Sequence, residues 1–600
     1  MKKRFLLSCT CLMLALLTVV GCQPTTPTTD PQTESTADTG DVADDAEFFD
    51  VVKNGVAIEI VYSMDADEEI LLEVHTFADS VYKLCGIRPR AVDDWLKAGE
   101  QYDNEKIQIL FGYTNYAESR SVYAEMNYGS SVCKVVGNKI VIAGADSEAL
   151  NKAALALTVA LKDNKNGDDY RIPKNFSKIS IVNEQLAAIP KVEGCAFPKT
   201  VFCGDDCYEL AFTDATETIY SDYLSGLSQA GYELYVENTI DSHKFATYTD
   251  GTTVLNLALM NKKKLLITSE PLKKSALQGL PEDNVYQSGV CSTTLTQLGL
   301  YYGDTPDANG YALQYANGMA YIYRLTDGSF IVIDGGHGTQ GHAERLYELL
   351  KKQAPDPENI TVAAWIFSHD HDDHVGFFTI FAKQYSEKVQ VERFLFNFPV
   401  ASQYVGEGDK GIGAYTKGAI RTYYPNAVQH KVHAGQVFYI RNATVRILFG
   451  LETLQPHKFD YYNDCSVVFQ VEVEGVKTLY LGDCGEDECI GLRTTYSAET
   501  LRSDILQVAH HGINGCDSTL YDLVAASYAF LPCGADKMKV NSDYIDSILN
   551  RPINRYIKAL SATPGRVFMA KDDVVVFTLS EGAVTNIATY ENMMAFLQLF

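Results

Sequence analysis

The C-terminal half of the chain alternates short apolar runs with longer stretches in which apolar residues recur every three or four positions. The short runs are bounded by Gly, Asp and Asn, which is typical of strands, and the longer stretches are typical of helices with one buried face. This order predicts an α/β fold in which two mixed sheets pack together and helices cover them, an αββα sandwich. The predicted strands are 320–324, 330–334, 361–368, 391–398, 436–440, 443–449, 466–473, 476–482, 528–532 and the paired strands 566–571 and 574–579, and the predicted helices are 340–353, 376–385 and 553–562.

Two smaller folded regions are predicted before this C-terminal domain, which we place at residues 286–600. The first, 48–190, has the pattern of a small α/β domain, and the second, 198–285, that of an α+β domain. Neither contains a catalytic carboxylate pair or a cofactor loop that we can identify. The predicted elements are strands 55–61 and 107–112, a hairpin 132–143 that turns at Gly137, helices 67–84 and 147–161, and then strand 207–212, helix 218–230 and strands 232–236, 244–249, 253–259 and 264–269.

The start of the chain has the pattern of an export signal. Three basic residues in Met1–Arg4 precede an apolar stretch, 5–20, that is too short to span a membrane. The sequence Val19-Val20-Gly21-Cys22 resembles a bacterial lipobox, in which Cys22 becomes a lipid-modified N-terminus; the alternative is an ordinary signal peptide with a chance cysteine. Residues 23–47, rich in Thr, Pro, Asp and Ala, predict a flexible tether. We therefore expect an exported protein, anchored by lipid to the outer face of a bacterial membrane.

The net charge argues against some classes of binding partner, and the cysteine pattern argues against a zinc finger. The chain has 50 Lys and Arg against 77 Asp and Glu, a net charge of −27. Such a field repels polyanions, which argues against nucleic acid as the partner. No zinc-finger spacing of cysteines is present, and we expect most of them to be small buried residues, although an exported location permits a disulfide such as Cys203–Cys207. The oligomeric state is not indicated.

The strongest chemical signal is the run Ser368-His369-Asp370-His371-Asp372-Asp373-His374. It directly follows the apolar run 362–367, so it lies on the loop at the C-terminal end of a buried strand. Imidazole nitrogens and carboxylate oxygens are ligands that zinc, iron and manganese accept. The run therefore predicts a metal site, and a solvated loop rich in His is the less favoured alternative.

Three other strands end in residues that could complete such a site. The first is 330–336, which contains Asp334 at its end, and the second is Leu479-Tyr480-Leu481-Gly482-Asp483. The third is 505–512, which ends in His510-His511-Gly512. We expect these strand ends to converge on the His-rich loop.

In this order the elements resemble the metallo-β-lactamase superfamily of hydrolases, in the branch that contains DNA-uptake channel proteins and cell-wall phosphorylcholine esterases. The resemblance covers roughly residues 286 to 580 and implies two divalent metal ions, zinc or alternatively manganese or iron(II). It also implies that Asp483 bridges both ions and that Asp334 orients the ligand loop from behind it. The implied metal ligands are His369 and His371 for one ion, Asp373 and His374 for the other, and Asp483 and His510.

Two positions in the site stay open. Many family members have another His on the first metal, and the candidates here, His430, His433 and His457, do not stand in a recognisable motif, so a structural role is favoured for the first two. The other open position is the ligand within His510-His511, since adjacent residues at a strand end point in opposite directions. The family pattern favours His510 as the ligand, and His511 would then be a proton donor beside the substrate.

The implied reaction is hydrolysis by a hydroxide that bridges the two ions, with Asp373 and His511 as the catalytic side chains. Phosphodiester hydrolysis, in a small molecule or an envelope polymer, is the first hypothesis. The second is hydrolysis of an ester, lactone or amide on the same scaffold. The third is a non-catalytic binding lipoprotein with a degenerate site.

Overall fold

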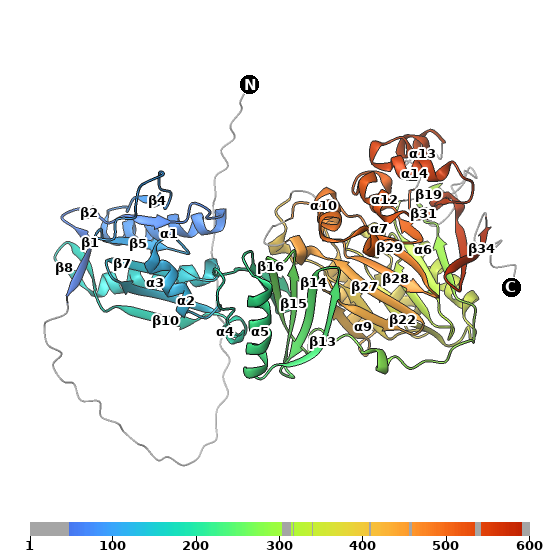
Figure 1. The fold of residues 1–600 in the computed structure, drawn as a ribbon, viewed down its shortest axis with the longest axis horizontal. Coiled ribbons are helices and arrows are strands. Elements are labelled where there is room, and N and C mark those ends of the chain that lie inside the picture. The colour runs from blue at the N-terminus through green and yellow to red at the C-terminus, as the bar shows by residue number, and fades with distance from the viewer. Residues whose placement is uncertain are drawn as a thin grey trace, which may run out of the picture. The chain divides into compact units, whose positions relative to one another are not determined.

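The computed structural model describes residues 47–302, 314–315, 317–338, 340–406, 410–454, 459–533 and 542–590 (Figure 1). The predicted signal, the lipobox Cys22, the tether up to residue 46 and His457 lie outside these residues. Within the described part of the chain, no helix combines the length and the apolar character that a membrane crossing requires.

The first folded region contains a mixed six-stranded sheet with helices on both faces and a separate four-stranded sheet. Its elements are β1 (Phe48–Lys53), β2 (Val56–Ala57), β3 (Ile60–Tyr62), α1 (Glu68–Cys85), β4 (Ala91–Asp93), β5 (Gln108–Phe111), α2 (Ala117–Glu125), β6 (Ser130–Val136), β7 (Lys139–Gly144), α3 (Ser147–Asp163), β8 (Lys165–Asn166), β9 (Asp169–Pro173), β10 (Ser177–Ile181) and α4 (Glu184–Ala188). The strand orders are β10-β6-β7-β5-β3-β4 and β2-β1-β9-β8. Ile109 packs with α1 and α3, whereas the next residue, Leu110, packs with α2.

The second region is one antiparallel sheet with a single helix on one face. It consists of β11 (Lys199–Gly204), β12 (Cys207–Phe212), α5 (Glu217–Gln229), β13 (Glu233–Ile240), β14 (His243–Thr249), β15 (Thr253–Met260) and β16 (Lys264–Pro271), in the order β11-β12-β16-β15-β14-β13. Leu227 of α5 packs on Leu257 and Ile267. On the other face, Phe245 and Leu266 pack against Ala434 of the C-terminal domain. This sheet is therefore fixed to the C-terminal domain through its apolar face.

The C-terminal domain contains the nine-stranded and the seven-stranded sheet. The first half has β17 (Thr294–Leu298), β18 (Tyr301–Tyr302), β19 (Gln314–Tyr315), β20 (Ala320–Arg324), β21 (Phe330–Asp334), α6 (Gln340–Gln353), β22 (Ile360–Ile366), α7 (Asp372–Val375), α8 (Phe378–Tyr385), β23 (Val389–Val391), β24 (Arg393–Phe396), α9 (Gly413–Tyr423) and β25 (Val428–Lys431). The second half has β26 (Val437–Ile440), β27 (Ala443–Phe449), β28 (Val468–Val473), β29 (Val476–Tyr480), α10 (Glu486–Thr495), α11 (Ala498–Leu501), β30 (Ile505–Gln507), α12 (Ser518–Val524), β31 (Tyr528–Leu531), α13 (Ser542–Leu549), α14 (Arg555–Ser561), β32 (Val567–Met569), β33 (Val574–Ser580) and β34 (Ala583–Tyr590).

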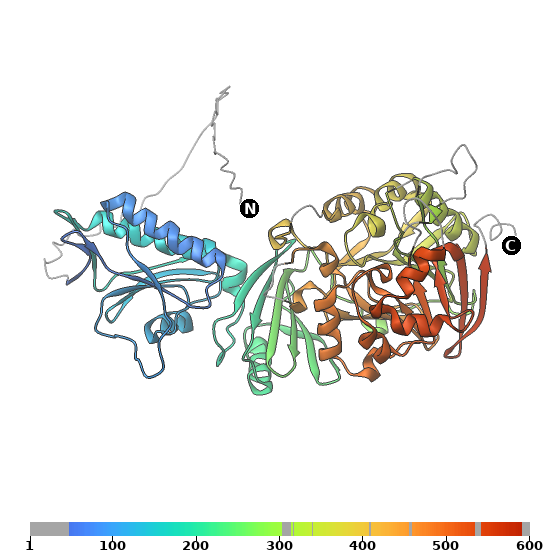
Figure 2. The ribbon, with the colours of Figure 1, turned by 90° about the horizontal axis from the view of Figure 1, so that it is seen from above.

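The two sheets pack face to face and are covered by helices. Their strand orders are β25-β24-β22-β21-β20-β17-β33-β34, with β23 beside β22, and β26-β27-β28-β29-β30-β31-β32. Ile331 and Ile366 of one sheet share a buried cluster with Phe469 of the other. α6, α8 and α9 cover the outer face of the first sheet, and α10, α12 and α14 that of the second. In Figure 2 the yellow-green helices and the orange to red helices lie on opposite sides of this domain. The predicted αββα sandwich is confirmed.

One predicted pairing is wrong. The strands predicted at 566–571 and 574–579 do not pair with each other, because β32 belongs to the seven-stranded sheet, beside β31, and β33 to the nine-stranded sheet, between β17 and β34. Between them, Asp573 has a positive φ of 53°, and its buried carboxylate pairs with Arg345 of α6. The chain thus crosses from one sheet to the other where a tight hairpin was expected.

Candidate metal centre

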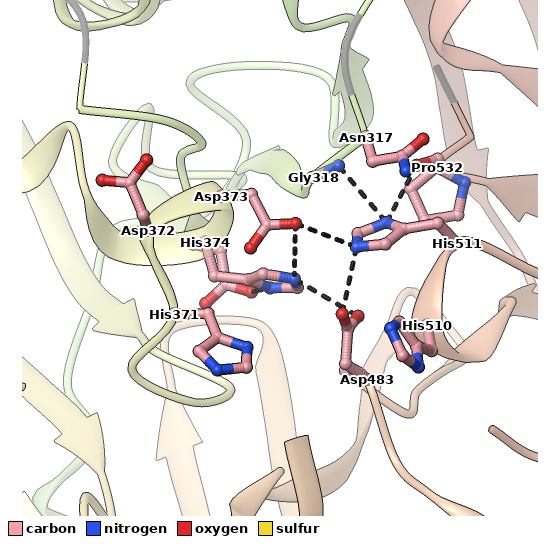
Figure 3. A network of polar contacts seen from close by, with 12 residues as sticks. Asn317, Gly318, His371, Asp372, Asp373, His374, Asp483, His510, His511 and Pro532 are labelled. Atoms are coloured by element: carbon pink, nitrogen blue, oxygen red, sulfur yellow. Dashed lines mark hydrogen bonds and ion pairs between the residues drawn. The ribbon is translucent and has the colours of Figure 1, made fainter. Parts of the chain in front are cut away.

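Four strand ends meet at one edge of the sandwich. β21 and β22 run parallel in one sheet, and β29 and β30 run parallel in the other, so their C-terminal ends lie at the same edge. The short helix α7 follows β22 and contains Asp373 and His374. Asp483 follows β29, and His510 and His511 follow β30 (Figure 3). The predicted convergence of residues near 370, 483 and 510 is therefore present in the structure.

Asp373, His374, Asp483 and His511 point at one another. Each offers one ligand atom, and these four atoms all lie within 4.8 Å of one another. Nε2 of His511 is 3.0 Å from Asp483 and 3.1 Å from Asp373, and Nε2 of His374 is 3.2 Å from Asp483 (Figure 3). Two imidazoles and two carboxylates around one point form a donor set that suits zinc, iron or manganese.

The contacts of these atoms fit a metal ion. Nε2 of His374, Nε2 of His511 and Oδ1 of Asp483 are buried, and none of them makes a well-aligned hydrogen bond to any described residue. Buried polar atoms are nearly always hydrogen-bonded in folded proteins, so these three atoms, held together only by ion-pair contacts, can accept a common partner. A divalent cation is a partner that all three can bind.

The other ring nitrogens of the two histidines are held by the surrounding structure. Nδ1 of His374 is 2.8 Å from the buried carboxylate of Asp334, which also accepts from the backbone N–H and the hydroxyl of Ser368. Nδ1 of His511 is 2.9 Å from the carbonyl of Pro532. The Gly318 amide lies 3.2 Å from the same nitrogen, but Nδ1 cannot both donate and accept, and the shorter contact to Pro532 makes it the donor. Nε2 is then the atom of each ring that can give up its proton and bind a metal. Asp334 thus has the position predicted for it.

The electrostatics of the four groups are strongly coupled. Burial by itself would lower the pKa of His374, but the carboxylates of Asp483 and Asp373 raise it well above its ordinary value. They likewise raise the pKa of His511 to about 9, against the effect of burial. Burial would raise the pKa of Asp483, but His511 and His374 hold it well below its usual range. Two imidazoliums therefore balance two carboxylates, and a divalent cation can replace the two protons without changing the buried charge.

His369 and His371 form a second pair beside the first group. Nε2 of His369 is 3.1 Å from Nδ1 of His371, and the ring of His369 lies 4.1 Å from that of His374, centroid to centroid. Burial, together with the neighbouring imidazoles, lowers the pKa of His369 well below its ordinary value, so this ring is neutral. A neutral imidazole is the form that binds a metal. This pair is in position for the second ion that the family resemblance implies.

The two adjacent histidines have the reverse of the predicted arrangement. His511 joins the group of ligand atoms, while Nε2 of His510 lies 3.1 Å from the amide nitrogen of Asn463. The exposed Tyr461 lies between His510 and His371, with ring centroids 6.1 Å and 5.9 Å away. The prediction assumed extended backbone, but both histidines have a left-handed conformation, with φ of 46° and 53°. In the structure His511, and not His510, is the member of the pair that faces the other candidate ligands.

The remaining candidate histidines take part in other contacts. Nδ1 of His430 is 3.0 Å from the carbonyl of Ala276, and burial lowers the pKa of His430 to about 4. His433 lies between the buried carboxylates of Glu270 and Glu452. His457 lies outside the described residues.

Two buried polar residues that we did not predict position the ligands. The Oε1 atom of Gln507 accepts from the amides of Leu481 and Gly482, both at 2.8 Å, and its Nε2 donates to the carbonyls of Gly482 and Val508. Gln507 thus ties the loop of Asp483 to the strand that leads to His511. Ser466 accepts from the amide of Asp483 at 3.0 Å. A polar residue inside the apolar run 505–509 was the signal that could have identified Gln507.

Comparisons with known proteins add a limited finding. No protein-family model and no curated protein matches the sequence. Among solved structures, the chain is similar to a Thermotoga maritima protein assigned to the zinc-dependent hydrolases of the metallo-β-lactamase superfamily, with 12% identity, a TM-score of 0.20, and 43% of this chain and 87% of that chain covered. It is also similar to CmlA, a diiron β-hydroxylase from Streptomyces venezuelae (11% identity, TM-score 0.29, 61% and 79% covered), and to unliganded yeast PDE1 (13%, 0.29, 48% and 99%).

The assignment of the two histidines predicts different metal contents for two matched variants. His511→Ala should bind at least one ion per chain fewer than the wild type, because it removes an atom from the ligand group. His510→Ala should keep the wild-type content, because its ring contacts Asn463. Elemental analysis after dialysis against trace Zn²⁺ measures both, and a loss confined to His510→Ala would contradict the assignment.

Gln507→Ala should weaken metal binding through the backbone. The substitution leaves the buried amides of Leu481 and Gly482 without their acceptor, which costs about 1–3 kcal/mol of folding stability for each amide. Because these amides hold the loop of Asp483, metal affinity should fall about tenfold or more. The matched control is Gln470→Ala, since Gln470 is also buried, lies on β28 of the same sheet, and contacts residues 500–503. Both variants should lower the melting temperature, and only Gln507→Ala should change the Zn²⁺ dissociation constant. Equal affinities in the two variants would exclude the positioning role.

Proposed function

We propose that this protein is a binuclear metal-dependent hydrolase. The proposal is carried by one observation: ligand atoms of Asp373, His374, Asp483 and His511 surround a common point, and those of the last three are buried without a well-aligned hydrogen bond to any described residue. His369 and His371, adjacent to this group, add donors for a second ion. The family resemblance of the motifs that bear these residues supports hydrolysis as the reaction.

The site is open on one side. The side chain of Asp373 is 24% exposed, whereas those of His374, Asp483 and His511 are buried. His371 and His510 are half-buried, and Tyr461, whose ring lies near both, is exposed. A substrate can therefore approach from the side of Asp373 while the rest of the ligand set stays out of solvent, where electrostatic stabilisation is strongest.

When bound, divalent ions would supply a water molecule that is activated near neutral pH and positive charge for the developing oxyanion. The chain's own residues hold this arrangement in place. The carboxylate of Asp334 and the carbonyl of Pro532 fix the orientation of the His374 and His511 rings. The carboxylates of Asp373 and Asp483 supply the negative charge that would balance the bound cations. The residue that we propose for a proton or hydrogen bond to the leaving group is His510, which contacts Asn463; this is the role that we first assigned to His511.

The substrate we propose is a phosphodiester, either in a small molecule or in an envelope polymer. The family branch supports this bond, and the net charge of −27 argues for a substrate without a long polyanionic chain. The location we propose is the outer face of a bacterial membrane, with the lipid on Cys22 as the anchor. The lipobox-like sequence and the acidic tether that follows it support this location.

The reaction is tested with the purified chain, loaded with Zn²⁺ or Mn²⁺. It should hydrolyse bis-p-nitrophenyl phosphate faster than p-nitrophenyl acetate or a lactone, and Asp373→Asn should lower kcat about 100-fold or more, because it removes a ligand charge. The matched control is Asp372→Asn, since the neighbouring Asp372 pairs with His337 and its side chain is 63% exposed. This control should keep kcat within about twofold of the wild type.

Faster turnover of the ester or lactone would support the hydrolase activity but would show that the substrate bond is not a phosphodiester. A metal-loaded wild type without turnover of any of these substrates, or an Asp373→Asn variant as active as the wild type, would contradict the proposed function.

A further inference from the structure

A second group of metal-ligand side chains is buried where the six-stranded sheet of the second region meets the C-terminal domain. It consists of Cys207 on β12, Glu270 on β16 and His433 between β25 and β26. Their ligand atoms all lie within 4.8 Å of one another, and the three residues are 0%, 3% and 4% exposed. These residues have no part in the candidate active site.

We propose that Cys207, Glu270 and His433 bind a structural zinc ion that fastens the second region to the C-terminal domain. A thiolate, an imidazole and a carboxylate are the three ligand types that protein zinc sites use. A tetrahedral ion with bonds of about 2.0 to 2.3 Å would bring the three atoms to about 3.5 Å from one another, which requires only small side-chain shifts from the observed positions.

His433 is oriented as a metal-bound histidine is. Its Nδ1 lies 2.9 Å from Oε1 of Glu452, and Oε2 of the same carboxylate accepts from Asn397 at 2.7 Å. Nε2 therefore faces Glu270, 3.3 Å away, on the side of the Cys207 thiol. A carboxylate behind the ring fixes the tautomer and leaves Nε2 for the metal, as Asp334 does for His374.

Zinc binding adds no positive charge to this region, and a second thiolate at Cys203 would lower the charge by one unit beside the buried Lys431. An imidazolium at His433 and a neutral thiol at Cys207 carry one positive charge together, and so do a zinc ion, a neutral imidazole and a thiolate. Zinc can therefore replace two protons without adding net charge to a region that also buries Glu452 and Lys431. The region tolerates the ion electrostatically.

In the proposed site, the buried Cys203 supplies the fourth ligand. It precedes Cys207 across the β11–β12 turn, and a hydrogen bond that the Cys207 thiol donates to Cys203, together with burial, holds the pKa of Cys207 well above its ordinary value. Its Sγ is also 4.0 Å from Oε2 of Glu209, a fully buried residue whose Oε1 has no hydrogen-bond partner among the described residues.

The site would join segments that are far apart in the chain. Residues 203–207 and 270 belong to the second region, and residue 433 to the C-terminal domain. Because an unfolded chain does not hold these positions together, the free energy of zinc binding would add directly to the stability of this junction.

Cobalt substitution separates this site from the active centre. Full-length protein, freed of metal by a chelator and kept reduced, is titrated with Co²⁺, and the near-ultraviolet band of thiolate-to-cobalt charge transfer is recorded. The proposed active-site ligands include no cysteine, so the band reports only the new site. We expect the band in the wild type and also in Asp373→Ala/His374→Ala, in which the active centre is disabled, so loss of the hydrolase function would leave this result unchanged.

Cys207→Ser should abolish the band and hold one zinc ion fewer than the wild type. Cys133→Ser is the matched control, because Cys133 is equally buried but lies on β6 in the first region, and it should keep the band. If Cys207→Ser does not fold, protection of two thiols by Zn²⁺ against alkylation in the wild type gives the second measurement. A wild type without the band, a band that survives in Cys207→Ser, or a Cys203–Cys207 disulfide in the native protein would overturn the proposal.

Discussion

The attraction between two carboxylates and two imidazoles across the seam of the sandwich is the interaction on which the candidate active centre depends. Asp373 and His374 come from one sheet, and Asp483 and His511 from the other. Removing charged groups from water is costly unless each finds a partner, so any one of these residues alone would destabilise the buried edge. Their convergence requires parallel pairing in both sheets, because only then do all four strand ends reach the same edge.

Residues around the cluster hydrogen-bond to the candidate ligands and keep them oriented toward one another. The carboxylate of Asp334 and the carbonyl of Pro532 hydrogen-bond to Nδ1 of His374 and of His511, respectively. These bonds prevent either ring from rotating toward another hydrogen-bond partner. Gln507, the last residue of β30, hydrogen-bonds to Leu481 and Gly482 after β29 and so holds the loop of Asp483 beside that of His511. The cluster at the second junction uses the same device, with Glu452 behind His433. In both places a backing acceptor leaves one nitrogen directed at other ligand atoms.

Much of the fold could be predicted from the sequence, because the signals are local. Strands 320–324, 330–334 and 443–449 and helix 340–353 have the predicted bounds, since each apolar run is bounded by turn residues. The change of sheet between β32 and β33 was missed, because two strands separated by a few residues normally form a hairpin, and only Asp573 and its contact with Arg345 mark the crossing. The reversal at His510-His511 was missed because a left-handed conformation at a residue other than glycine leaves no sign in the sequence. The group of Cys207, Glu270 and His433 could not be found from spacing, because its members meet only in the folded chain.

Anomalous X-ray diffraction from zinc-loaded crystals of the full chain, recorded on both sides of the zinc absorption edge, tests the central claim most directly. The account predicts a strong zinc peak within bonding distance of Nε2 of His374 and Nε2 of His511, beside the carboxylates of Asp373 and Asp483. Zinc peaks elsewhere on the molecule, with none at this point, would contradict it.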